Sequence, residues 1–310
     1  MFYYRAFGLK ISSEINFPEL YQTDLMLDAD IQIKYGEIPS SVITNADFIS
    51  DTLIISPQVF LLKIEGVATY LVEAGKTIKI EMVDGADLNE VRLFCLSNAF
   101  AALLHQRGKI PLHAAAFIHE NELVLIMGES GVGKSTTLAA MINRGYSPFS
   151  DDICIPYYDD QDRSWYAYSS YPMMKFWADT YTKVNIGNIG DGRKLRSGLD
   201  KYGVYFHEKF IPASRKIKLI ILLEIDSRQN EVRSRQLTGI ESFSTIHAQA
   251  YRKEYLEFES MLKDYFIQSS EIAKSVKSFM LSRPDNMESP LSIVECIESI
   301  LIPKTLASSE

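Results

Sequence analysis

The feature that most constrains the fold of this chain is the octapeptide Gly-Glu-Ser-Gly-Val-Gly-Lys-Ser at residues 128–135. It fills every fixed position of the pattern G-x-x-x-x-G-K-[ST]. The apolar run at residues 123–127 precedes it and predicts a buried strand. Residues 136–144 follow it and predict a helix that ends before Gly145, a residue suited to a helix C-cap. The order strand, glycine-rich loop, helix indicates an α/β fold.

This order also predicts a cradle for a triphosphate. Glycines allow backbone N–H groups to close around phosphate oxygens, and the N-terminus of the helix adds partial positive charge. The ammonium of Lys134 would reach the β and γ phosphates, and the hydroxyl of Ser135 would hold Mg²⁺. We therefore expect ATP and Mg²⁺ as cofactors. The expected nucleotide contacts are Gly128, Glu129, Ser130, Gly131, Val132, Gly133, Lys134, Ser135 and Thr136.

Composition narrows the class of protein. The 310 residues are 46% hydrophobic, which suffices for a large core, and their net charge is −8. A nucleic-acid-binding surface would need a basic excess, so we expect no nucleic-acid partner. No apolar run approaches the roughly 18 residues that cross a membrane, and the first residues lack the features of a signal peptide. The 3 cysteines are scattered, as in a reducing compartment. These features predict a cytoplasmic protein with no membrane partner.

The pattern along the chain predicts three regions. Residues 1–87 are β-rich, and their turn spacing predicts an antiparallel meander; the expected strands lie at residues 4–11, 31–35, 59–64, 68–72 and 77–82. Residues 88–240 form the expected catalytic core, with a long helix over 88–106 and strands at 112–118, 123–127, 153–158 and 216–225. Residues 241–310 form a mainly helical C-terminal region.

A nucleotide site alone does not specify a reaction. Chemistry on a Mg-bound triphosphate needs a further acid near the metal and a group that orients or deprotonates the acceptor. Asp151 and Asp152 follow the loop closely, although paired aspartates also occur in solvated turns. The apolar run at 219–223, followed by Glu224 and Asp226, imitates the hydrophobic-then-acidic strand of ordinary ATPases. A buried strand that ends in a solvated acid is the simpler interpretation of that run.

The wider pattern resembles a known family. The segments Leu112-His113-Ala114-Ala115-Ala116, residues 123–135, Arg144-Gly145-Tyr146 and Ser150-Asp151-Asp152 are together similar to the catalytic core of the HPr kinase/phosphorylase-like serine kinases. Residues 4–9, 17–20 and 103–108 resemble the shorter bacterial homologues, which include the kinases of lasso-peptide precursors. The resemblance implies an α/β fold of α+β character. Its P-loop core would be like that of HPr kinase and PEP carboxykinase, preceded by a β-rich N-terminal region.

The resemblance also implies roles for individual residues. It makes Lys134 the lysine that clamps the phosphates and Ser135 a magnesium ligand. Asp151 would be the base that accepts the proton of the acceptor hydroxyl, and Asp152 would lie beside it as a metal ligand. His113 matches the family's histidine near the site, although a hydrogen-bonded structural histidine at a strand start is an alternative.

The implied activity is ATP-dependent phosphorylation of a peptide on serine, in particular the C-terminal serine of a lasso-peptide precursor. Relatives in this family assemble, so the resemblance also allows a homo-oligomer. Two differences from the family pattern indicate which kind of member this chain resembles. Thr136 replaces the acidic residue that follows the loop serine in HPr kinases, and their later Arg-Gly-Leu-Gly signature is missing. These departures argue against HPr itself as the substrate and against the reverse, phosphorolytic reaction.

A basic group of residues follows the loop in sequence. Lys175, Arg193, Lys194 and Arg196 would supply positive charge to the transferring phosphoryl group or to an acidic substrate. A solvated basic loop is the alternative interpretation.

Two other functions would use the same loop. An ATPase or nucleotide-dependent switch would take Glu224 or Asp226 as its metal acid, and a kinase of another protein or a small-molecule hydroxyl would share all the loop chemistry.

Overall fold

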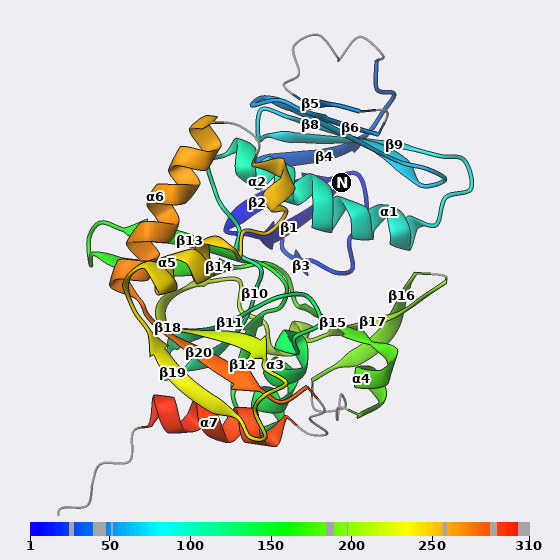
Figure 1. Ribbon diagram of the computed structural model, residues 1–310. Helices are drawn as coiled ribbons and strands as arrows, with labels where there is room; N and C mark the ends of the chain where they lie inside the picture. The colour runs from blue at the N-terminus through cyan, green and yellow to red at the C-terminus, as the bar shows by residue number, and fades with distance from the viewer. Residues whose placement is uncertain are drawn as a thin grey trace, which may run out of the picture.

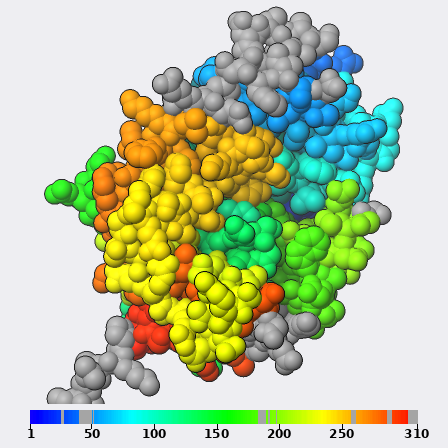
Figure 2. All heavy atoms as spheres, in the orientation of Figure 1, coloured from blue at the N-terminus to red at the C-terminus, as the bar shows by residue number. Residues whose placement is uncertain are grey.

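The computed structural model describes residues 1–24, 28–39, 48–50, 52–183, 189–196, 198–256, 259–285 and 290–302. Three sheets organise these residues: a 9-stranded sheet, an 8-stranded central sheet and a 3-stranded sheet (Figure 1). The fold is therefore mixed α/β, as the sequence predicts. Figure 2 shows the blue and cyan N-terminal part packed directly on the green to orange remainder. No helix in the described ranges has both the length and the apolarity to cross a membrane.

The 9-stranded sheet is built from the first part of the chain. Its strands are β1 (Phe2–Ala6), β2 (Leu9–Ser13), β3 (Tyr21–Gln22), β4 (Ile31–Tyr35), β5 (Phe48–Ile49), β6 (Leu53–Ile55), β7 (Val59–Ile64), β8 (Ala68–Glu73) and β9 (Thr77–Met82). From β5 to β9 each strand pairs antiparallel with the next, which confirms the meander there. The prediction of an antiparallel meander is wrong at β4, which pairs in parallel with both β2 and β9. Residue alternation within a strand does not reveal the direction of its neighbours.

The single strand expected over residues 4–11 is also wrong. The chain forms a hairpin instead, because Phe7 and Gly8 adopt left-handed φ angles of 57° and 74° between β1 and β2. A Cβ on Gly8 would lie 2.6 Å from the ring of Tyr168, so this turn has no room for a side chain. The apolar pattern continues through residues 7 and 8, so the sequence pattern does not indicate a turn there.

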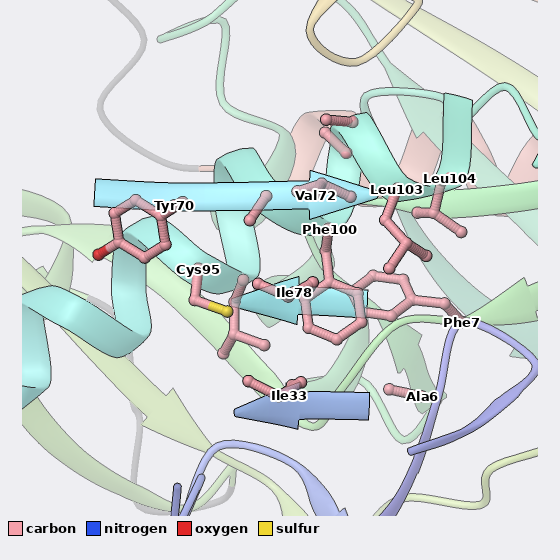
Figure 3. Packing of buried hydrophobic residues seen from close by; sticks show 14 of the residues in the cluster. Ala6, Phe7, Ile33, Tyr70, Val72, Ile78, Cys95, Phe100, Leu103 and Leu104 are labelled. Carbon is pink, nitrogen blue, oxygen red and sulfur yellow. The ribbon is translucent and has the colours of Figure 1, made fainter. Parts of the chain in front are cut away.

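The helix expected over residues 88–106 forms in three consecutive segments. These are α1 (Leu88–Phe94), the π-helical η2 (Cys95–Ala99) and α2 (Phe100–Gln106). Asp87 caps the N-terminus by accepting a hydrogen bond from the backbone N–H of Asn89. Figure 3 shows how Cys95, Phe100, Leu103 and Leu104 from this helix pack against Ile33, Tyr70, Val72 and Ile78 from the sheet. The helix thereby closes the N-terminal core.

The central sheet contains the strand that precedes the glycine-rich loop. Its members are β10 (Ala114–His119), β11 (Glu122–Met127), β12 (Ser147–Ser150), β13 (Cys154–Asp159), β14 (Ser164–Ser169), β18 (Ser214–Ile225), β19 (Arg233–Leu237) and β20 (Lys277–Arg283). The 12-residue strand β18 lies in the middle and pairs in parallel with β11 and β20. Strand β20 is not predicted from sequence, because its 7 residues lie within a region that is otherwise mainly helical.

Helices cover both faces of the central sheet. On one face lie α3 (Lys134–Asn143) and α7 (Leu291–Leu301), and on the other lie α5 (Gly239–His247) and α6 (Glu259–Ser275). Alternate residues of β11 serve the two faces, since side chains of a strand point to opposite sides. Val124 and Ile126 join the core under α3, whereas Leu123 and Leu125 join the core under α5 and α6. Strand β11 is therefore buried on both faces and holds the start of the loop rigidly.

The 3-stranded sheet borders the loop. It contains β15 (Met173–Trp177), β16 (Asp191–Arg196) and β17 (Leu199–Tyr205). The short helix α4 (Ala178–Lys183) lies between β15 and β16, η4 (His207–Lys209) follows β17, and η5 (Lys253–Tyr255) follows α5. The described part of the basic segment 187–203 forms the β16–β17 hairpin; residues 187, 188 and 197 lie outside the described residues. Pairing of β15 with β17 places Lys175 opposite Gly203 and Trp177 opposite Lys201.

The buried side chain of His105 in α2 makes stability depend on pH. Its Nε2 donates to the carbonyl of Tyr251, while Nδ1 is buried with no hydrogen-bond partner among the described residues. Burial lowers the pKa of His105 to about 4. The neutral form is therefore favoured by folding, and the unfolded chain binds the proton first as the pH falls.

We expect the contribution of His105 to the free energy of unfolding to be fully present above pH 6.5. This contribution should fall by about 3 kcal/mol as the pH drops toward 4. Urea unfolding at a series of pH values measures this slope. The variant His105→Gln keeps a donor but cannot titrate, so its stability should vary less over the same range. An unchanged slope in the variant would contradict the assignment.

Candidate active site

The glycine-rich loop connects β11 to α3, where the sequence predicts it. Gly128, Gly131 and Gly133 have φ angles of 139°, 85° and 109°, which side chains rarely adopt. Gly128 is restricted further, because a Cβ there would lie 2.5 Å from the carbonyl oxygen of Leu223 in β18. The loop therefore follows its path only with glycine at the position where it leaves the sheet.

Lys134 folds back over the loop that it follows. Its Nζ donates to the carbonyl oxygens of Gly128 at 2.8 Å and Glu129 at 3.0 Å, and the residue is buried. Burial lowers the pKa of Lys134, and the negative charges of Asp151 and Asp152 oppose that shift. The ammonium is thus held at the mouth of the loop, close to two carboxylates.

Asp151 contacts the loop directly. The hydroxyl of Ser135 donates to its two carboxylate oxygens at 2.9 and 3.1 Å, and the backbone N–H of Lys175 donates to Oδ2 at 2.9 Å. Only 2% of the residue is exposed. Burial, with a contribution from neighbouring Asp152, raises the pKa of Asp151 to about 6.

Asp152 faces a different set of partners, because its backbone adopts a left-handed φ of 73°. Lys175 Nζ lies 2.7 Å from Oδ2, Tyr251 donates its hydroxyl to the same oxygen at 3.5 Å, and His113 Nε2 lies 3.9 Å from Oδ1. Burial alone would raise the pKa of Asp152, but Lys175 and His113 outweigh it and lower that pKa. The two adjacent carboxyls therefore have pKa values shifted in opposite directions, a pattern common at catalytic sites.

His113 lies at the edge of this group. Its backbone N–H donates to the carbonyl of Gln249, and its ring lies 5.7 Å from the ring of Tyr251. Burial lowers the pKa of His113 to about 4, although Asp152 opposes the shift. The imidazole is consequently neutral near pH 7 and available as a hydrogen-bonding group.

Two adjoining cavities meet at these residues. A cavity of about 120 Å³ lies over the loop and is lined by Ser130, Gly131, Gly133, Lys134, Ser135, Thr136, Asp151, Phe176, Trp177 and Thr180. A larger one of about 410 Å³ extends toward α1 and η2. His113, Asp152, Lys175 and Lys201 line both. These four side chains therefore stand at the junction between the loop and a space large enough for a second substrate.

The structure brings together most of the residues singled out from sequence. Lys134, Ser135, Asp151, Asp152, His113 and Lys175 all line the cavity over the loop. The basic cluster is divided, however. Arg196 lines the larger adjoining cavity, whereas Arg193 and Lys194 line a separate cavity of about 290 Å³. Lys194 pairs there with Asp200 at 3.1 Å.

Sequence reasoning missed Lys201 and Tyr251. The Nζ of Lys201 lies 5.2 Å from the centre of the Trp177 ring, and burial together with Lys175 lowers its pKa. Lys201 belongs to the basic segment at residues 187–203, as Lys194 does. Only the strand register, which places Lys201 opposite Trp177, shows that Lys201 lies at the site. Nothing near Tyr251 in the sequence indicates its place beside Asp152.

The alternative acids have other partners. Asp226 forms an ion pair with Arg228 at 2.9 Å, and Glu224 accepts a hydrogen bond from Ser282. Glu224 lines a further cavity of about 420 Å³, beside Gly128, Glu129 and Val132 of the loop. Ser135 donates to Asp151 rather than to either of these acids. Within the described part of the chain, no three His, Cys, Asp or Glu side chains cluster as a metal site would require.

Comparison with known proteins finds distant structural similarity. No protein-family model matches the sequence, and no curated protein matches it. Among solved structures, the Hpr(Ser) kinase/phosphatase from Coxiella burnetii is similar at 12% identity and a TM-score of 0.33. That similarity covers 62% of this chain and 90% of the other.

The contact between Gly128 and β18 leads to a testable contrast. Gly128→Ala should displace the loop, lower the melting temperature and abolish measurable ATP binding, because the new Cβ meets the Leu223 carbonyl. Gly131→Ala introduces a Cβ with nothing within 4 Å, so only the left-handed backbone cost of about 1 kcal/mol applies. Thermal unfolding and binding of a fluorescent ATP analogue measure both effects. Equal loss in the two variants would show that the close approach is not the reason for glycine at 128.

Proposed function

We propose that the protein is a Mg-ATP-dependent kinase that transfers a phosphoryl group to a serine hydroxyl of a peptide. The observation that carries the proposal is the position of Asp152, which lines both the cavity over the glycine-rich loop and the larger adjoining cavity. A donor and an acceptor bound in the two cavities would meet at this carboxylate. A simple nucleotide switch has no need of the second cavity.

The loop supplies the groups that hold a triphosphate. Backbone N–H groups between Gly128 and Ser135 and the N-terminus of the 10-residue helix α3 suit phosphate oxygens. Lys134 lies buried at the mouth of the loop and would turn its ammonium to the phosphates. Phosphate oxygens would replace the two carbonyl oxygens that this ammonium contacts.

The residues present also fit a magnesium ion. Mg²⁺ prefers hard oxygen ligands and usually takes one or two carboxylates together with phosphates and water. The hydroxyl of Ser135 and the carboxylate of Asp151 are adjacent oxygen donors beside Lys134. When bound, Mg²⁺ would neutralise charge on the phosphate oxygens. Sharing of Asp151 with Ser135 favours this residue over Asp152 for the metal, which exchanges the roles implied by the family resemblance.

Asp152 then becomes the base. The acceptor oxygen forms a bond to the γ-phosphorus as the bond from that phosphorus to the β–γ bridging oxygen breaks, so that ADP leaves. The proton of the acceptor hydroxyl passes to a carboxylate oxygen of Asp152. Lys175 and His113 lower the pKa of Asp152, which keeps it ionised and makes it a weak base. A weak base suffices where phosphoryl transfer is loose and positioning matters more than basicity.

Neighbouring side chains complete the arrangement. Lys175 fixes both carboxylates, through its backbone N–H to Asp151 and its ammonium to Asp152. Lys201 stands at the junction of the cavities and would stabilise charge on the transferring phosphoryl group. The acceptor, proposed from the family resemblance, is the C-terminal serine of a ribosomal natural-product precursor.

Substitution of the two aspartates separates their roles. Asp152→Asn should lower kcat at least about a hundredfold while Mg-ATP still binds, because only the proton acceptor is lost. Asp151→Asn should instead raise the Mg²⁺ concentration needed for half-maximal activity. Asp226→Asn is the control and should leave transfer unchanged, since its carboxylate pairs with Arg228. Transfer that survives Asp152→Asn but fails in Asp226→Asn would reject the proposed site.

Phosphorylation of a peptide is the direct test of the activity. Incubation with Mg-ATP and a precursor peptide ending in serine should give a product heavier by one phosphoryl group. Tandem mass spectrometry should place that group on the serine. A Ser→Ala peptide is the matched control and should not change. Binding of ATP without any mass shift on serine peptides would rule out the proposed reaction.

A further inference from the structure

We infer that the larger cavity is the acceptor site and that Arg196 and Arg252 bind a carboxylate of the acceptor next to its hydroxyl. This inference rests on the proposed function, because it assigns the substrate side of the same site. Besides His113, Asp152 and Lys175, three segments far apart in sequence line this cavity, whose volume is about 410 Å³. They are the α1–η2 helix, the β16–β17 hairpin and the segment from Tyr251 to Glu254.

The cavity has a charge opposite to that of the protein. The chain carries a net charge of −8. The cavity nevertheless contains the cations Lys175, Arg196, Lys201 and Arg252 but only the acids Asp152 and Glu254. Lys175 pairs with Asp152 at 2.7 Å, Arg252 with Glu254 at 3.2 Å and Arg196 with Glu90 at 3.5 Å. Lys201 is the remaining cation of the lining, and it forms no ion pair with a described residue. A concentrated cationic cavity in an acidic protein favours an anionic group on the ligand.

Arg196 presents a guanidinium that is only partly satisfied. Its Nε lies 3.5 Å from Glu90 Oε1, but this buried atom makes no hydrogen bond within the described residues. The guanidinium carbon lies 5.9 Å from the centre of the Phe94 ring, and both residues line the cavity. A planar, fixed guanidinium is suited to bidentate binding of a carboxylate.

Arg252, which directly precedes η5, also has a guanidinium that is only partly hydrogen-bonded. Its Nη1 contacts Glu254 at 3.2 Å, while its Nε is buried without a hydrogen-bond partner among the described residues. The backbone of Arg252 is left-handed, with φ of 54°, a conformation that costs energy in a residue with a side chain. Hydrogen bonds of Tyr251 to Pro111 and of Tyr255 to Arg252 hold this strained turn. In this backbone conformation Arg252 lines the cavity.

The π-helical segment supplies the polar floor. Ser97 and Asn98 both line the cavity, and Asn98 is held by hydrogen bonds with Ser97 and Tyr255. A π-turn shifts the helix by one residue and often marks a functional site. Leu93, Leu195 and Leu199 line the remaining wall, which suits the aliphatic part of a peptide. The acceptor hydroxyl would then lie at Asp152 with the carboxylate at the two arginines.

Three peptides that differ only at the C-terminus test this assignment. The first ends in serine with a free carboxylate, the second is its amide, and the third is an amide with aspartate beside the serine. Binding is measured by fluorescence anisotropy with a non-hydrolysable ATP analogue, and KM is measured with saturating ATP. We expect the amide to bind at least about tenfold more weakly than the free acid, as for loss of one charge-assisted contact. Recovery with the third peptide would show that a side-chain carboxylate serves equally well.

The arginine variants locate the effect. Arg196→Gln and Arg252→Gln should each raise KM for the free-acid peptide about tenfold, with kcat and the KM for ATP unchanged, and should leave the amide peptide unaffected. Arg233→Gln is the matched control, because that arginine pairs with Glu231 in an exposed position. Melting temperatures identify any variant that fails to fold. If Arg252→Gln is unstable, Arg196→Gln, in the β16–β17 hairpin, still tests the assignment.

The outcomes separate the two proposals. Carboxylate-dependent binding without phosphoryl transfer would overturn the kinase proposal and retain the anion-binding cavity. Equal binding of acid and amide, or equal effects of the arginine variants on both, would overturn the cavity assignment even if transfer occurs.

Discussion

The site depends on one residue, Lys175, which joins two carboxylates that would otherwise repel each other. Its backbone N–H binds Asp151 and its ammonium binds Asp152, so β15 is attached to the end of β12 at a single point. Burial of an unpaired carboxylate costs several kcal/mol, and a close cation is the usual compensation. Without Lys175, the buried Asp151 and the half-buried Asp152 would lie beside each other, with Lys134 and Lys201 as the cations of the cavity lining.

This arrangement also explains why the two aspartates differ. Asp151 directly follows strand β12 and accepts hydrogen bonds from Ser135, whereas the left-handed backbone of Asp152 turns its side chain toward Lys175 and the larger cavity. Adjacent residues thereby serve two cavities. A phosphoryl-transfer enzyme needs this division, because the groups that hold the donor and the group that receives the acceptor's proton lie on opposite sides of the reacting phosphorus.

Local sequence patterns predicted the parts of the site that are local in the fold. Strands β7 and β9 were predicted at their observed bounds, and the strand, loop and helix from β11 to α3 were predicted nearly so. The predictions failed where partners are remote. The parallel pairing of β4, the strand β20 and the hairpin at Phe7 depend on contacts that alternation does not encode. The same limit applies to Lys201 and Tyr251, which reach the site from β17 and from the segment before η5.

The glycine-rich loop, with Lys134 and Ser135 at fixed spacing from its glycines, can be recognised from sequence alone, because a loop of this kind forms from consecutive residues. The sequence also identified Asp151 and Asp152 as companions of the loop. The three-dimensional arrangement of the chain, in contrast, is needed to tell which aspartate faces which cavity, which basic residues lie at the site and where the larger cavity lies. The physical reason is that these properties arise from packing. Segments separated by dozens of residues line the larger cavity, and burial together with the charge of Lys175 shifts the pKa values of Asp151 and Asp152.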